Sequence, residues 1–453
     1  MQKSALTRLR AAVVSRLATE AGRQTAVLYA AQLSSMALNF LFTVVIGRTM
    51  SQEDFGVFSF CAFSIIIFSG YMFEFGVFSA GARLLAIAGT PEAERRTFGT
   101  LVVAGLAIGL LFAIVIAASG PGIDAAMHAL GFPDTQVARI LLIASPLAAS
   151  VPLQLLIEFT CQGTNRIGML AAFRLALPIA SISTILGLRA VYGDISPLSA
   201  LVAYLAGITV AVVGVGAALR PSFAIGRRDF KQLAAAVREY GLDMYLGRAI
   251  NMMSARLDQV LIPLFVGPKR WGAYRIAQQV SDPVQNLARS LATTRFKSFA
   301  SRTHVSVYIE RWNMALLAVA AFLLASLGPW AITFVFPGKF RNALPLLLPF
   351  ALVAFFAGLL QPYNTFLTAH GAGRALRNIA LALGVLNLGG LLFVVRRYGL
   401  LGAAWFAVGS MAFNFCLHLY YYQRLRSDLE RTNTQHEHHG DGDQTTDPRT
   451  VGQ

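Results

Sequence analysis

Seven polar side chains recur at helical spacing within one otherwise apolar segment of this 453-residue chain: Arg275, Gln278, Gln279, Asp282, Gln285, Asn286 and Arg289. At about 100° per residue, positions seven apart drift by only about 20°, so these side chains share one face of a helix. Such a face could bind an anionic group or carry a coupling ion. It cannot meet lipid, because one charge at the bilayer centre costs roughly 2.5–3.5 kcal/mol. We therefore expect the stripe to line a polar cavity inside a helix bundle.

The preceding apolar segment carries a second set of polar side chains. Arg248, Asn251 and Gln259 share one helical face there, and Arg256 and Asp258 flank it. Arginine suits a phosphate ligand, because its planar guanidinium binds two oxygen atoms at once and stays charged. We therefore predict an anion-binding cavity between the two segments. Its predicted cations are Arg248, Arg256, Arg275 and Arg289.

Asp282 is expected close to the membrane midplane, because about 16 Å of helix separates it from Trp271 at the start of the segment. Pro283 beside it removes a backbone donor and predicts a kink at the same depth. A midplane carboxylate is a natural carrier of a coupling ion, so we expect Asp282 or Asp258 to bind H⁺ or Na⁺. A structural ion pair between Asp282 and an arginine of the preceding segment is the alternative. The other predicted cavity residues are the amides Gln278, Gln279, Gln285 and Asn286.

Further charged side chains interrupt the apolar segments of the first half. Glu158 and Arg174 lie near the same end of two consecutive segments, which favours a salt bridge between them over a role in transport. Glu74 is expected to cap a neighbouring helix or to pair with Arg83. None of these residues is assigned to the predicted cavity.

The composition is that of a polytopic membrane protein. Hydrophobic residues make up 56% and charged residues 13% of the chain, and the mean hydropathy is +0.58, whereas soluble domains carry about 25% charged residues. We attribute the net charge of +16 to loops that follow the positive-inside rule, and we expect no nucleic-acid partner. No Gly-rich phosphate loop, His–Cys cluster or nucleophile motif appears, so we predict no enzyme activity, metal site or cofactor.

Apolar runs long enough to cross a bilayer, about 20 residues each, recur about twelve times and predict an all-α fold. They lie near 26–46, 56–79, 98–118, 138–160, 168–190, 197–219, 241–266, 271–294, 313–335, 343–368, 376–395 and 399–422. Lys and Arg concentrate in the loops on the side of the N-terminus. Both termini are therefore predicted to be cytoplasmic.

Short motifs recur in the two halves of the chain. The Phe-Gly pair at 55–56 corresponds to the Trp-Gly pair at 271–272, and the Tyr-Gly pair at 192–193 corresponds to the one at 398–399. Offsets of about 210 residues indicate one duplication of about six spans, with the two halves related by an axis along the membrane normal. A substrate-binding site is then expected between the two halves.

The expected organisation has five parts. They are a basic amphipathic leader on the cytoplasmic surface (1–25), a six-helix lobe (26–219), a basic cytoplasmic linker (220–240), a second six-helix lobe (241–422) and a disordered cytoplasmic tail (423–453). The two lobes are expected to enclose a central cavity.

Several segments together resemble one transporter family. They read GRTMSQEDFGVF at 47–58, FEFG at 73–76, GAGR at 371–374 and YGLLGAA at 398–404. Their order across the spans is similar to that in the polysaccharide-exporter branch of the multidrug/oligosaccharidyl-lipid/polysaccharide transporter superfamily. The resemblance covers roughly residues 26–422.

This resemblance implies a Wzx-type flippase with a MATE-like fold. Such a protein moves undecaprenyl-pyrophosphate-linked oligosaccharide units across the bacterial inner membrane by alternating access, for O-antigen, capsule or exopolysaccharide synthesis. The implied partners are that lipid-linked cargo, membrane lipids, an H⁺ or Na⁺ counter-ion, and a polysaccharide polymerase and export complex. The alternative is a cation-coupled multidrug antiporter of the same superfamily. Two arginines against one aspartate within 275–289 favour an anionic cargo.

Overall fold

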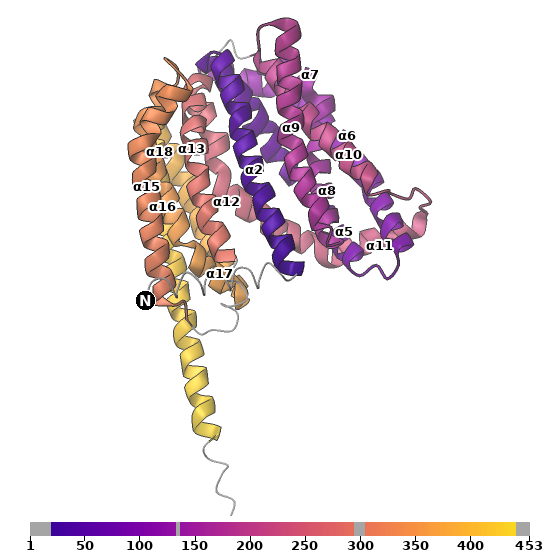
Figure 1. The fold of residues 1–453 in the computed structure, drawn as a ribbon, viewed down its shortest axis with the longest axis vertical. Helices are drawn as coiled ribbons and strands as arrows, with labels where there is room; N and C mark the ends of the chain where they lie inside the picture. The colour runs from indigo at the N-terminus through magenta and orange to yellow at the C-terminus, as the bar shows by residue number, and fades with distance from the viewer. Residues whose placement is uncertain (1–19, 133–135, 294–303, 441–453) are drawn as a thin grey trace, which may run out of the picture.

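The computed structural model describes residues 20–132, 136–293 and 304–440. These residues form helices and the turns between them, and no strand occurs among them. Figure 1 shows two helix bundles side by side, one built from the first half of the chain and one from the second. The predicted all-α architecture is thereby confirmed for the described residues.

The first bundle, here the N-terminal lobe, consists of α2 (Glu20–Thr49), α3 (Gln52–Ser59), η1 (Phe60–Ile67), α4 (Phe68–Met72), α5 (Val77–Ala86), α6 (Pro91–Ala129), α7 (Val137–Ala148), α8 (Ser150–Gly163), α9 (Ile167–Tyr192) and α10 (Pro197–Ala218). The linker holds α11 (Arg227–Ala236) and η2 (Val237–Gly241). The C-terminal lobe consists of α12 (Leu242–Val266), α13 (Pro268–Thr293), α15 (Val307–Val335), η3 (Arg341–Leu346), α16 (Leu347–Leu359), α17 (Gln361–Ala369) and α18 (Gly373–Gly440).

Nine helical stretches among the described residues are long and apolar enough to cross a membrane. The helices α12 and α13 are not among them, because both carry many charged and amide side chains. The helix α18 contains two antiparallel segments: Ser410 donates a hydrogen bond to Asn387 (2.6 Å) and Asn378 donates one to Tyr421 (3.3 Å). The turn between them is at Gly399, whose φ is +61°. The number of twelve spans stays a prediction.

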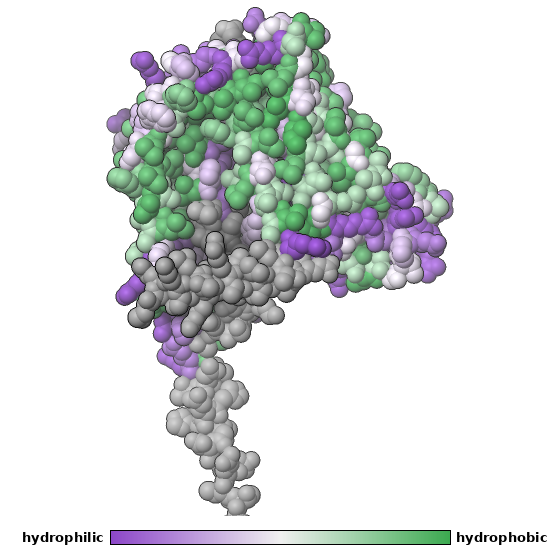
Figure 2. Space-filling view, in the orientation of Figure 1, coloured by the Kyte–Doolittle hydropathy of each residue, from purple (hydrophilic) through white to green (hydrophobic). Residues whose placement is uncertain are grey.

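An apolar belt surrounds the molecule. In Figure 2, hydrophobic residues cover the middle of the visible face and hydrophilic residues gather toward its ends. Large apolar side chains such as Phe322, Val385 and Phe393 are 69%, 77% and 68% exposed. Soluble monomers rarely expose apolar patches of this extent, whereas lipid accommodates them. The chain is a multi-pass membrane protein.

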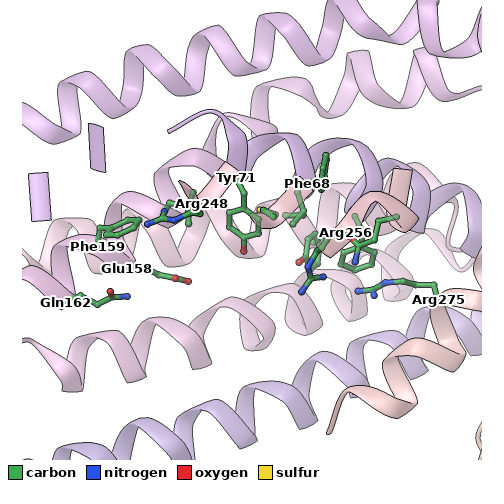
Figure 3. A pocket seen from close by; sticks show the side chains of 14 residues that line it. Phe68, Tyr71, Glu158, Phe159, Gln162, Arg248, Arg256 and Arg275 are labelled. Atoms are coloured by element: carbon green, nitrogen blue, oxygen red, sulfur yellow. The ribbon is translucent and has the colours of Figure 1, made fainter. Parts of the chain in front are cut away.

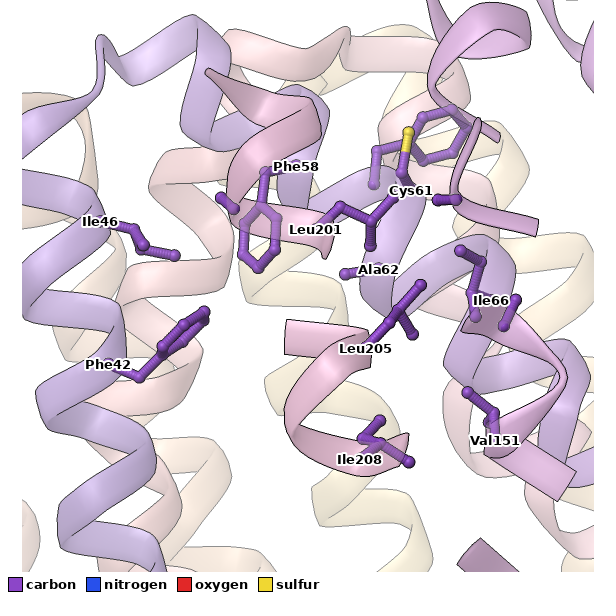
Figure 4. Packing of buried hydrophobic residues seen from close by; sticks show 14 of the residues in the cluster. Phe42, Ile46, Phe58, Cys61, Ala62, Ile66, Val151, Leu201, Leu205 and Ile208 are labelled. Carbon is purple, nitrogen blue, oxygen red and sulfur yellow. The ribbon is translucent and has the colours of Figure 1, made fainter. Parts of the chain in front are cut away.

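The core of the N-terminal lobe forms where α2, α3 and η1 pack against α8 and α10 (Figure 4). Phe42 of α2 and Phe58 of α3 are 2% and 1% exposed, and their ring centroids lie 6.2 Å apart. Leu201 and Leu205 of α10 belong to the same buried cluster as Cys61 of η1. Because lipid tails are as apolar as these side chains, close van der Waals packing is what stabilises the cluster. It fixes η1, which lines the cavity between the lobes, and α2, which lines an adjoining cavity.

The two lobes touch where α3 meets the start of α13, a region that we call the α3 end. A Cβ atom on Gly56 of α3 would lie 1.8 Å from the carbonyl oxygen of Pro268, so only glycine permits this approach. A Cβ on Gly272 of α13 would lie 3.2 Å from the Cα of Gly56. The repeated Phe-Gly and Trp-Gly pairs therefore meet each other, as expected for halves related by an axis between them.

Hydrogen bonds reinforce the contact at the α3 end. The side-chain amide of Gln52 donates to the carbonyl of Lys269 (3.0 Å). Lys339, which follows α15, donates to the carbonyl of Met50 (2.7 Å). Both bonds connect the N-terminal lobe with the C-terminal lobe, so the α3 end of the molecule is closed.

The linker is held against the N-terminal lobe. Asp229 of α11 accepts a hydrogen bond from the backbone N–H of Gly226 (2.8 Å) and forms an ion pair with Arg96 of α6 (3.1 Å). These two interactions, the backbone bond first, lower the pKa of Asp229. We call this side of the molecule, opposite to the α3 end, the α11 end.

The C-terminal region differs from the sequence-based expectation. The helix α18 continues to Gly440, so residues 423–440 are helical where we predicted a disordered tail. Leu425 and Leu429 pack against a buried cluster, and Arg426 pairs with Glu430 one turn later (2.7 Å). Both contacts favour continued helix. Residues 1–19 of the expected leader and residues 441–453 lie outside the described residues.

The glycine contact at the α3 end predicts a sensitive position. Gly56→Ala should lower the melting temperature of the detergent-solubilised protein by several degrees, because an overpacked contact costs about 1–3 kcal/mol. Gly187→Ala is the matched control, since nothing lies within 4 Å of a Cβ at that position of α9. Equal melting temperatures for the two variants would contradict the close approach of the lobes at Gly56.

Candidate functional site

A cavity of about 510 Å³ lies between the lobes (Figure 3). Both lobes contribute polar and aromatic side chains to it. The residues from the N-terminal lobe are Phe63, Ile67, Phe68, Tyr71, Leu155, Glu158, Phe159, Gln162 and Tyr204, and those from the C-terminal lobe are Arg248, Met252, Arg256, Gln259 and Arg275. Three of the four arginines that we predicted as cavity cations line this cavity, and their binding of an anion stays a prediction.

One end of this cavity is formed by Arg256 and Arg275. Their guanidinium groups point into the same open space in Figure 3. Arg256 lies at a break in α12, with φ −131° and ψ 17°. We predicted a kink at Pro283, but α13 continues through Pro283 as one helix. The break lies in the neighbouring helix α12 instead. A proline removes one backbone hydrogen bond, and in a membrane a group of a neighbouring helix can bind the carbonyl oxygen that is left without a donor.

Arg275 is held by neutral groups. Its guanidinium carbon lies 4.5 Å from the ring centroid of Phe63, and Nη1 donates to the side-chain oxygen of Gln278 (2.7 Å). Its buried Nε has no hydrogen-bond partner among the described residues. The charge of Arg275 is thus positioned by an aromatic ring and an amide, and donors of its fork remain available for a ligand.

Arg248 has a carboxylate partner in the other lobe. Its Nη1 donates to Glu74 Oε1 at 2.6 Å, and its guanidinium stacks on Phe159 at 4.6 Å. Glu74 is fully buried and lies in the turn before α5. The expected partner Arg83 instead stacks on Tyr240 (5.0 Å). The pair joins the first half of α12 to the N-terminal lobe and neutralises Arg248.

A second cavity of about 620 Å³ lies between α2 and α13. Arg275, Gln279, Asp282 and Asn286 line it from α13. Gln279 forms a hydrogen bond with the hydroxyl of Thr43 on α2 (2.9 Å). Figure 2 shows a narrow hydrophilic strip between α2 and α13 within the apolar belt. Arg275 lines both this cavity and the one between the lobes, so the two adjoin.

A third cavity, of about 270 Å³, lies inside the C-terminal lobe between α12, α13, α16 and α18. Asp258 faces it, and the hydroxyl of Tyr274 lies 3.4 Å from its carboxylate. Gln278, Asp282 and Gln285 line it from α13. The polar pair of Asn387 and Ser410 lines it from α18.

The structure divides the predicted stripe between two faces of α13. Residues of the one polar stripe therefore line two different cavities. Arg275, Gln279, Asp282 and Asn286 face the cavity toward α2, and Gln278, Asp282 and Gln285 face the interior of the C-terminal lobe. Asp282 is common to both. The side chain of Arg289 lies outside the described part of α13.

Glu158 is a cavity residue that the sequence-based prediction missed. No ion pair between Glu158 and Arg174 occurs among the described residues, and Arg174 instead donates to Gln32 on α2 (2.7 Å). Glu158 is approached by the amide of Gln154 (3.5 Å) and lines the cavity. The available signal was the i, i+4 spacing of Gln154, Glu158 and Gln162, which gives α8 a polar face.

The comparisons with known proteins agree with this architecture. A family model described as polysaccharide biosynthesis protein matches residues 21–296. The teichuronic acid biosynthesis protein TuaB of Bacillus subtilis (strain 168) is 30% identical over 207 residues, which are 44% of this chain and 42% of that protein. The alignment therefore spans less than half of that relative.

Solved structures share the fold. An inward-facing multidrug resistance transporter of the MATE family in the MOP superfamily has a TM-score of 0.69 and 14% identity, over 88% of this chain and 96% of that one. The lipid II flippase MurJ in an inward closed conformation has a TM-score of 0.68 and 15% identity, over 87% of each chain. The predicted MATE-like fold is confirmed.

The ion pair between the lobes predicts a strong effect of a small change. Glu74→Gln should lower stability by about 2–3 kcal/mol, somewhat below the 3–5 kcal/mol of a fully buried pair, because Arg248 is 33% exposed. Thermal unfolding in detergent measures this effect. Asp229→Asn is the control, since its ion pair with Arg96 is at the surface and should contribute less than about 1 kcal/mol. Equal destabilisation in both variants would contradict a special role of Glu74.

Proposed function

The chain belongs to the polysaccharide biosynthesis protein family, whose model matches residues 21–296. We propose that it is a lipid-linked oligosaccharide flippase. Its cargo would be oligosaccharide repeat units on undecaprenyl pyrophosphate, moved from the cytoplasmic to the periplasmic leaflet of the bacterial inner membrane. The lipid II flippase MurJ, which shares the fold, is named for a lipid-linked cargo. TuaB is named for the synthesis of a polysaccharide.

The observation that carries this proposal is the pair of arginines at one end of the interlobe cavity. None of the ion pairs among the described residues involves Arg256 or Arg275. Asp258 and Asp282 lie near these arginines without forming a salt bridge with either of them in the described part of the chain. In a cavity partly lined by aromatic side chains, two such cations attract an anion more strongly than they would in water. A pyrophosphate, which has to leave interfacial water, is a ligand of matching charge.

The cavity between α2 and α13 supports a lipid cargo. It adjoins the arginine end through Arg275, and its α2 wall includes the apolar side chains Leu33, Met36 and Phe40. A cargo could therefore place its pyrophosphate at the arginines while its isoprenoid chain extends between α2 and α13 toward lipid. The isoprenoid chain then does not have to enter the interlobe cavity.

Alternating access and sidedness complete the proposal. The excess of Lys and Arg on the α11 side favours a cytoplasmic α11 end and cytoplasmic termini. The contacts at the α3 end then close the cavity on the periplasmic side. Release would require the lobes to separate at Gly56 and Pro268 and to approach each other at the α11 end. A polysaccharide polymerase and export complex would receive the cargo.

The cavity in the C-terminal lobe supports a role for a coupling cation. Asp258, Asp282 and the amide of Asn387 line one cavity, which Arg256 also lines. Carboxylate and amide oxygens bind hard cations, and a carboxylate can also carry a proton. We assign H⁺ or Na⁺ coupling to Asp258 or Asp282. The multidrug antiporter is the second candidate function, and the similarity to a MATE transporter favours it.

The anion-binding end gives a direct test. Arg256→Gln and Arg275→Gln should each weaken binding of undecaprenyl pyrophosphate to the purified protein about tenfold or more, because a hydrogen bond to a charged group contributes about 1.5–3 kcal/mol. Titration of the lipid into nanodisc-embedded protein measures the dissociation constant. Arg189→Gln, at the exposed end of α9, is the control.

Two outcomes decide between the candidate functions. Unchanged affinity in both cavity variants would show that the arginines do not bind the pyrophosphate. Export of a cationic dye by the reconstituted protein, without any binding of the lipid, would favour the antiporter.

Coupling is tested by removing one carboxylate at a time. Flipping of a fluorescent lipid-linked glycan in vesicles should be stimulated by an imposed pH or Na⁺ gradient in the wild type. Asp258→Asn or Asp282→Asn should abolish the stimulation, because an amide carries neither a proton nor a charge. Glu92→Gln, at the exposed start of α6, should respond like the wild type. A full gradient response in both aspartate variants would sink the hypothesis.

A further inference from the structure

We propose that the end of the interlobe cavity formed by Tyr71, Glu158, Phe159 and Gln162 is a saccharide-binding subsite, separate from the arginine end. The inference rests on the proposed flippase function and assigns a place to each part of its cargo. It also gives Glu158 a role in choosing the glycan.

The four side chains converge from two elements of the N-terminal lobe. Glu158 and Gln162 lie one turn apart on α8, so they share a face. In Figure 3 both point into the cavity from the same side, and the hydroxyl of Tyr71 points into it from α4. Gln162 is exposed to the cavity and Glu158 is half-buried. Each therefore has polar atoms that a ligand can reach.

The two ends of the cavity are well separated. Arg248, which stacks on Phe159, and Arg256 are eight residues apart on α12, which corresponds to about 12 Å along a helix. Figure 3 shows Glu158, Phe159 and Gln162 at one end of the cavity and Arg256 with Arg275 at the other. A single elongated ligand can therefore meet both groups at once.

The chemistry of this end suits a sugar better than a phosphate. A carboxylate only accepts hydrogen bonds, and the Glu158 charge repels another anion. The guanidinium groups of Arg174 and Arg248 partly offset this charge, although each already has another partner, Gln32 at 2.7 Å and Glu74 at 2.6 Å. Sugar hydroxyls, in contrast, donate to a carboxylate and both donate to and accept from Gln162 and Tyr71.

Aromatic walls complete the match to a carbohydrate. Phe159 lines the same end of the cavity as Glu158, and Tyr71 and Phe68 lie between that end and Arg256 (Figure 3). A pyranose ring has an apolar C–H face and a rim of hydroxyls, so it needs an apolar surface beside polar groups. Pockets for polar ligands generally combine such surfaces with a few placed polar atoms. The cargo would thus lie with its pyrophosphate at Arg256 and Arg275 and its glycan toward the α11 end.

A comparison of two lipids isolates the contribution of the sugar. The full-length protein in nanodiscs is titrated with undecaprenyl pyrophosphate and with undecaprenyl-pyrophosphoryl N-acetylglucosamine. The wild type should bind the glycosylated lipid about tenfold more tightly, as expected for a hydrogen bond to a charged group. Glu158→Gln and Gln162→Ala should reduce this preference to about twofold or less and leave the affinity for the bare lipid unchanged.

Control variants separate this inference from the proposed function. Arg256→Gln should weaken both lipids equally, and Glu92→Gln should change neither. Equal affinity of the wild type for the two lipids, or equal weakening of both by Glu158→Gln, would overturn the saccharide subsite and leave the flippase proposal standing. Binding of neither lipid by the wild type would overturn the proposed function, and the subsite with it.

Discussion

The need to keep charged side chains away from lipid determines where the polar residues of this protein lie. Several charges inside the helix bundle are compensated by neighbouring groups. Glu74 is fully buried and bonded to Arg248 (2.6 Å), Asp258 is approached by the hydroxyl of Tyr274, and Arg275 is held by Phe63 and Gln278. These contacts draw α12 and α13 toward the molecular axis. Helices too polar to face lipid thereby become the walls of the cavity.

Local periodicity was sufficient to find the cavity walls but not the contacts across them. The polar face of α13 follows from its spacing, and Arg248, Arg256 and Arg275 do line the cavity. The partner of Arg248 is 174 residues away in the chain, and no local pattern pairs it with Glu74. Glu158 was missed for the same reason: its spacing to Arg174 suggested a local salt bridge, while the fold turns Arg174 toward Gln32. The division of the stripe between two spaces also depends on how α13 is rotated among its neighbours.

Corresponding glycine motifs of the two halves have similar structural roles, whereas the polar residues of the halves differ. Gly193 and Gly399 both adopt positive φ, and Gly56 and Gly272 meet at the α3 end, so the repeated positions keep their structural roles. The polar stripe has no counterpart in the N-terminal lobe, which contributes aromatic rings and Glu158 to the cavity. A site built in this way presents cations on one wall and hydrogen-bonding and aromatic groups on the other. Such asymmetry suits a cargo whose two ends differ in charge.

The break in α12 connects the site with the arrangement of the lobes. The first half of α12 is bound to the N-terminal lobe through Arg248 and through Tyr245, whose hydroxyl donates to the carbonyl of Met72 (3.0 Å). The second half packs within the C-terminal lobe beside α18. While these contacts hold, a movement of one lobe against the other would be taken up between these halves, where Arg256 has non-helical dihedral angles. Because Arg256 also lines the cavity, such a movement would change its position relative to Arg275, and the affinity for an anion would depend on the lobe arrangement.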